Sequence, residues 1–114
     1  MGIWGSDIFD NDAAAAAKAI FEDAIAEGLS VADATARVMA ELGEIAKNED
    51  VLAVIQLALA AMQLEHKALD PNLRDEVLQI IRSGKSLKPW ADLGETNLAQ
   101  RKQALSVLGA ALSA

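Results

Sequence analysis

The chain offers few side chains with which acid–base or nucleophilic catalysis could be built. Its 114 residues include one histidine, His66, and no cysteine. A catalytic triad needs a histidine beside a serine nucleophile and a carboxylate, and no serine of this chain stands out from the others. Without cysteine there is no thiol nucleophile, disulfide or zinc–thiolate centre. We therefore expect no catalytic residues and favour a protein that is not an enzyme.

The acidic residues do not form a known metal-binding pattern. The Asp-Asn-Asp run at residues 10–12 has the spacing that begins a calcium loop, but the glycine and glutamate that such a loop requires are replaced by Ala15 and Phe21. The di-iron pattern of helical bundles needs a glutamate three residues before a histidine, and Gln63 stands there. The sequence predicts no metal and no bound cofactor, and it assigns residues 10–12 to capping the helix that follows.

A basic stretch late in the chain has part of a phosphate-binding motif. Gly84-Lys85-Ser86 matches the end of a P-loop, but that motif needs a further glycine where this chain has Gln79, on a predicted helix. We therefore reject a P-loop. Arg82, Lys85 and Lys88 still form a small basic patch, which we interpret as a solvated loop, with pairing to the acidic half of the chain as the alternative.

The first eleven residues concentrate aromatic and small side chains. Trp4 and Phe9 can each bury about 150–250 Å², and Gly2 and Gly5 would let the backbone turn tightly around the indole. We expect an ordered segment whose two rings close one end of the hydrophobic core. The functional alternative is that the segment forms the rim of a binding site.

The elements that position these residues are predicted to be helices. Hydrophobic residues make up 53% of the chain but aromatic residues only 4%, and the abundant alanine and leucine are the strongest helix formers. No long apolar–polar alternation indicates a strand. We expect one all-α domain, residues 1–114, in which segment 1–11 packs on a compact bundle of about five helices. The helices are predicted at residues 12–27, 31–47, 50–67, 71–83 and 95–112.

The predicted third helix is apolar nearly all round between residues 51 and 64. A helix without a polar face is surrounded by protein or faces a partner, so we place it at the centre of the bundle. Self-association through this helix, or through the small residues 109–111, is a further hypothesis. The apolar run is too short to cross a bilayer, and no secretory signal begins the chain. We expect a cytoplasmic protein without a membrane partner.

Charge is distributed unevenly along the chain. The net charge is −7, and residues 1–50 hold eleven acidic residues against three basic ones. Such a segment repels phosphate backbones, so nucleic acid is not an expected partner. The same charge would favour and accelerate encounter with a basic protein.

The N-terminal residues resemble an uncharacterised, mainly bacterial family. Its members begin with a Met-Gly-x-Trp-Gly segment followed shortly by Phe-Asp-Asn-Asp and an alanine, and this chain carries the same pattern. The matching residues beyond the initiating methionine are Gly2, Trp4, Gly5, Phe9, Asp10, Asn11, Asp12 and Ala13. The family is DUF4259, a domain of unknown function. The resemblance implies a small bacterial cytoplasmic protein, and it transfers no catalytic residues.

Two functional hypotheses follow. The first is a protein-binding module that neutralises a basic partner, as immunity proteins do, and it rests on the charge asymmetry. The second is a small-ligand-binding protein or an enzyme, with a pocket near Trp4, Phe9 and Trp90.

Overall fold

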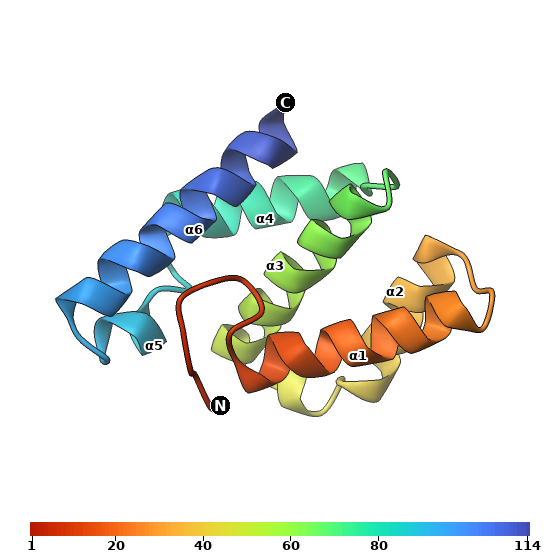
Figure 1. The fold of residues 1–114 in the computed structure, drawn as a ribbon, viewed down its shortest axis with the longest axis horizontal. Coiled ribbons are helices and arrows are strands. Elements are labelled where there is room, and N and C mark those ends of the chain that lie inside the picture. The colour runs from red at the N-terminus through yellow and green to blue at the C-terminus, as the bar shows by residue number, and fades with distance from the viewer.

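The chain folds into helices joined by short connections, with no β-sheet (Figure 1). A computed structural model describes all 114 residues. The elements are α1 (Asp12–Ala26), α2 (Val31–Glu41), the 3-10 turn η1 (Ile45–Lys47), α3 (Glu49–Glu65), α4 (Pro71–Ser83), α5 (Lys88–Ala91) and α6 (Glu95–Ser113). The predicted all-α class is confirmed. None of the helices combines the length and the apolar character that crossing a bilayer requires.

Side-chain caps define where most of the helices begin. Asn11, Ser30, Asn48 and Asp70 each accept a hydrogen bond from a backbone N–H in the first turn of the helix that follows. A cap of this kind stabilises a helix by about 1 kcal/mol. The first turns of these helices are thus specified by local sequence, and tertiary packing has only to select how the helices meet.

The centre of the molecule is α3, which is buried along two sides. One hydrophobic cluster joins α1, α2 and one side of α3, and its α3 members are Val54, Ile55, Ala58, Leu59 and Met62. A second cluster joins the other side of α3 to α4 and α6, and its α3 members are Ala53, Leu57 and Ala60. This double burial explains why the helix lacks a polar face. The apolar surface of α3 is therefore occupied within the chain.

Figure 1 shows the consequence for the shape. The α3 helix crosses the middle of the molecule, with α1 and α2 on one side and α4 and α6 on the other. The N-terminal segment, residues 1–11, lies between these halves. Its Ile8 packs against both clusters. The segment is thus part of the junction between the halves.

Two of the expected boundaries are wrong. The helix expected at residues 31–47 ends at Glu41, and the chain then turns through residues 42–44 into η1. Gly43 lies in this turn, where its low helix propensity favours a break. Between the helices expected at residues 71–83 and 95–112, where no helix was expected, the structure has α5, with Pro89 in its first turn. Proline is tolerated there because that N–H has no partner within the helix.

The shared use of α3 predicts one cooperative unit. Ile55 and Leu57 are both fully buried, on opposite sides of α3. We expect Ile55→Ala and Leu57→Ala each to lower the free energy of unfolding by about 2–5 kcal/mol, in a single transition. Urea denaturation followed by circular dichroism and by tryptophan fluorescence in a Trp4→Phe background checks this, because the remaining Trp90 belongs to the first cluster only. If the circular dichroism and fluorescence transitions of Leu57→Ala had different midpoints, the two clusters would not unfold as one cooperative unit.

Candidate functional site

The N-terminal segment is closed into a loop by its own backbone. An isolated antiparallel bridge pairs residues 3 and 11. The Trp4 N–H donates to the carbonyl oxygen of Asp10 at 3.0 Å, and the Asp12 N–H donates to that of Gly2 at 2.8 Å. We call residues 2–12 the N-terminal loop. Its two arms are extended and its tip is formed by residues 5–9, so the first residues of the chain lie beside the start of α1.

Two carboxylates fill the spaces left by the glycines of this loop. The Asp12 carboxylate accepts a hydrogen bond from the Gly2 N–H at 3.0 Å. That of Asp10 accepts one from the Asp7 N–H at 3.3 Å. A Cβ on Gly5 would lie only 2.9 Å from Cγ of Asp10, closer than real Cβ contacts. The glycines thus make room for aspartate side chains. The sequence had led us to expect that they let the backbone turn around the indole, and they do not have that role.

The tip of the loop is bound by α5 and α6. Nη1 of Arg101 donates to the backbone carbonyls of Asp7 at 2.8 Å and Ser6 at 3.3 Å. The indole N–H of Trp90 donates to the Gly5 carbonyl at 3.0 Å. The Arg101 guanidinium also stacks on the Trp90 ring, 3.8 Å from its centroid. We call these contacts the Arg101 clasp.

Arg101 is an unusual buried cation. Its side chain has no solvent exposure, and burial lowers its pKa to about 10, an effect that the carboxylates of Asp10 and Asp7 oppose. It therefore remains protonated at neutral pH. Its Nε and Nη2 atoms have no hydrogen-bond partner in the protein. A buried cation that is incompletely bonded is costly, so the remaining contacts to the loop carbonyls matter strongly to the fold.

Sequence reasoning missed Arg101, although a signal for it exists. The apolar stripe of α6 includes Leu98, Leu105, Leu108 and Leu112, and Arg101 occupies the stripe position between the first two. A charged residue on an apolar stripe indicates a buried partner or a buried π face. Both are present here, as loop carbonyls and the ring of Trp90.

The expected burial of Trp4 is wrong. Its side chain is 61% exposed, while that of Ile3 packs against the first hydrophobic cluster. Successive side chains of an extended segment point to opposite sides, so the inward position of Ile3 directs Trp4 to solvent. Phe9 is half-buried and packs on the same cluster, with Nζ of Lys18 5.1 Å from its ring centroid. Only one of the two loop rings closes the core.

The three rings expected around a pocket do not line a common hollow. Trp90 is fully buried and Trp4 faces solvent. Phe9 lines a hollow of about 580 Å³ between the loop and α6. Another hollow, of about 360 Å³, lies at the N-terminus and is lined mainly by apolar residues that include Met1 and Ile45. Neither hollow is lined by Trp4 or Trp90.

The residues first considered for catalysis or metal binding have contacts that serve packing and helix capping. His66 ends α3, and its ring packs against that of Phe21 with centroids 5.4 Å apart. Of the acidic run at residues 10–12, Asn11 caps α1 through a 2.8 Å hydrogen bond from the Ala14 N–H. No three side chains of histidine, aspartate or glutamate gather where they could hold a metal ion.

The fold and the clasped loop define a small all-α domain closed by its own N-terminus. Over residues 2–114 the chain matches the family described as Domain of unknown function (DUF4259). The chain belongs to this family, as its N-terminal residues indicated, and the match extends far beyond them. No curated protein and no solved structure matches the chain.

The clasp predicts that Arg101 is important for stability. We expect Arg101→Ala to lower the free energy of unfolding by about 2–4 kcal/mol, because it removes two hydrogen bonds and leaves a cavity beside Trp90. Arg101→Lys keeps the charge but loses the planar stack on Trp90. Its free energy of unfolding should therefore lie between those of the wild type and Arg101→Ala. Chemical denaturation measures both. If Arg101→Ala were as stable as the wild type, the Arg101 clasp would not contribute to the free energy of unfolding.

The glycines offer a matched pair of substitutions. Gly5→Ala should lower the free energy of unfolding by about 1–3 kcal/mol, because the added methyl group collides with Asp10 and overpacks the loop. Gly109→Ala, within α6, meets only ordinary contacts with Ile81 at 3.6 Å and should add about 0.5–1 kcal/mol. In thermal unfolding, Gly5→Ala should lower the melting temperature relative to the wild type and Gly109→Ala should raise it.

Proposed function

We propose that this protein is a small protein-binding module of the bacterial cytoplasm that docks a basic partner protein through the N-terminal loop. Neutralisation of that partner, in the manner of an immunity protein, is the role that suits such a module. The observation that carries the proposal is the exposed indole of Trp4 on a loop fixed by the Arg101 clasp. Tryptophan is enriched among the residues that dominate the energy of protein interfaces.

The loop presents Trp4 in a defined position. Backbone hydrogen bonds hold its two arms together, and Arg101 and Trp90 hold its tip. An anchor side chain that is already ordered loses less entropy when it binds. A flexible tail with the same sequence would lack this advantage, so the clasp supports a binding role for the exposed ring.

The charge around the loop supports a basic partner. The acidic first fifty residues form the N-terminal loop, α1, α2, η1 and the start of α3. The α1 and α2 helices lie on one side of α3, and the loop lies beside them at the junction of the two halves (Figure 1). Asp7 and Asp12 of the loop are exposed. The asymmetry along the sequence is therefore also an asymmetry in space. A basic surface would be steered toward this side and would reach Trp4 there.

The alternative hypothesis placed a small-ligand pocket near Trp4, Phe9 and Trp90. The burial of Trp90 and the absence of both tryptophans from the hollow that Phe9 lines do not favour a pocket at that place. Protein binding through one exposed ring needs no enclosed cavity, and it is the proposal that we carry forward.

The proposal is tested by capturing partners from cells of the source organism with immobilised wild-type protein and with Trp4→Ala. Leu93→Ala is the matched control, because Leu93 is also an exposed large apolar residue, at 50%, but it lies in the turn before α6 and lines neither hollow beside the loop. We expect a basic protein whose affinity falls about 30-fold or more in Trp4→Ala, and less than about threefold in the control. Its binding should also weaken as salt is added.

A second measurement uses the purified partner. Because Trp90 is buried, changes in emission on binding should come from Trp4, which shifts to shorter wavelength when the partner covers it. Partners that bind the Trp4→Ala protein as tightly as the wild type, or the absence of any basic protein among those captured, would refute the proposal.

A further inference from the structure

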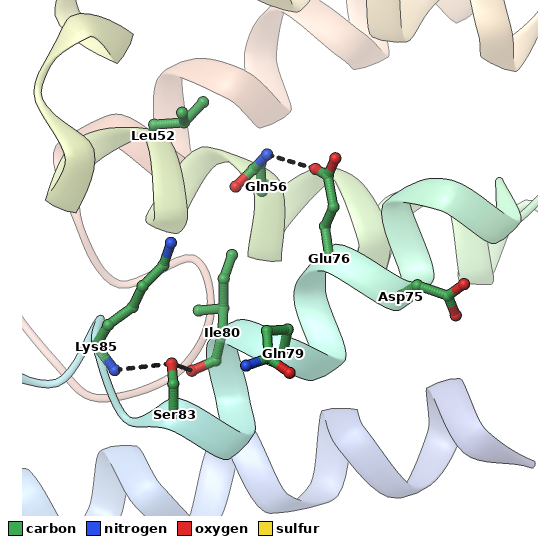
Figure 2. A pocket seen from close by; sticks show the side chains of 8 residues that line it. All are labelled: Leu52, Gln56, Asp75, Glu76, Gln79, Ile80, Ser83 and Lys85. Atoms are coloured by element: carbon green, nitrogen blue, oxygen red, sulfur yellow. Dashed lines mark hydrogen bonds between the residues drawn. The ribbon is translucent and has the colours of Figure 1, made fainter.

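A second region of the surface, between α3 and α4, has a hollow that no residue of the N-terminal loop lines (Figure 2). Its volume is about 660 Å³, which is in the range of small-molecule sites. Its lining residues are Leu52, Gln56, Asp75, Glu76, Gln79, Ile80, Ser83 and Lys85. We call this hollow the α3–α4 groove. Charged groups of both signs line it, together with two apolar residues.

The negative side of the groove is organised across two helices. Nε2 of Gln56, on α3, donates to a carboxylate oxygen of Glu76, on α4, at 2.9 Å. This bond orients both side chains and leaves the second carboxylate oxygen of Glu76 without a protein partner. Figure 2 shows the amide oxygen of Gln56 directed away from Glu76, toward the interior of the groove. Two acceptors are thus placed along one wall.

The positive side is the ammonium group of Lys85. Its side chain extends from the end of α4 toward α3 (Figure 2). Its backbone N–H donates to Oγ of Ser83 at 3.4 Å, and that hydroxyl donates to the Ile80 carbonyl at 3.1 Å. These bonds shape the turn that places Lys85. Two nearby cations differ, because Lys88 pairs with Asp92 and Arg74 with Asp75.

Lys85 and Glu76 face the same groove without neutralising each other. Neither takes part in any ion pair of the structure. Leu52 and Ile80 are the two apolar residues of the lining. A ligand with an anionic end, a short apolar chain and a cationic end would match all three features.

We propose that the α3–α4 groove binds a small zwitterion whose ammonium and anionic groups are separated by a short hydrocarbon chain. The anionic group is bound by Nζ of Lys85, and the ammonium group donates to Glu76 and to the amide oxygen of Gln56. This site does not include the N-terminal loop. A result that refutes zwitterion binding would therefore leave the proposed docking of a protein unaffected, and the reverse also holds.

The probe for this site is 6-aminohexanoate, titrated into ¹⁵N-labelled protein and followed by two-dimensional NMR. We expect saturable shifts of the amide signals around Gln56, Glu76 and Lys85. The dissociation constant should be roughly 1–10 mM, because a probe with about nine non-hydrogen atoms offers little more binding energy. Hexanoate and hexylamine, which each carry one of the two charges, should bind at least about tenfold more weakly.

Two variants test the residues, and two matched variants control for charge. Glu76→Gln and Lys85→Gln should each weaken binding about tenfold or more. Glu95→Gln and Lys102→Gln remove the same charges from exposed positions of α6 outside the groove. Each should change the dissociation constant of the probe less than twofold. Unshifted spectra at about 100 mM probe, equal binding of the singly charged probes, or equal losses in the control variants would overturn the proposal.

Discussion

The whole fold depends on the burial of α3 from two directions. A helix of seventeen residues with almost no polar face cannot be stable at a surface, so the chain has to cover it on both sides. The α1 and α2 helices cover one side, and α4 and α6 cover the other. Every other feature follows from this arrangement: the two halves of the molecule, the junction between them that the N-terminal loop fills, and the groove that remains where α3 and α4 diverge.

The N-terminal loop is stabilised in a different way. Its contacts are mostly polar, and they join backbone carbonyls to a buried guanidinium and an indole N–H. Polar contacts depend more steeply on geometry than apolar packing does, so the loop has one well-defined conformation. The exposed position of Trp4 is a product of that conformation, because the inward orientation of Ile3 and the pairing of the arms leave the indole no other direction.

The sequence predicted the helices better than it predicted the loop. Caps such as Ser30 and Asp70 act within a single turn, so they can be recognised locally, and the apolar run of residues 51–64 indicated the central helix for the same reason. The break after Glu41 had a local signal in the low helix propensity of Gly43, but a single glycine within a helical pattern does not by itself end a helix. The orientation of Trp4 depends on the register of the loop against Arg101, more than ninety residues away. The α3–α4 groove was not predicted, because Gln56, Glu76 and Lys85 come together only when two helices pack.

The clasp joins the two ends of the chain, and this has a consequence for biosynthesis. The bonds from Arg101 span 94 and 95 residues, and that from Trp90 spans 85. During translation the loop leaves the ribosome first, and at about 5–20 residues per second its partners follow roughly 5–20 seconds later. For that interval residues 2–12 have no clasp, so the side chain of Trp4 acquires its fixed position only after residue 101 has been made. A chain truncated before residue 101 therefore cannot assemble the clasped loop.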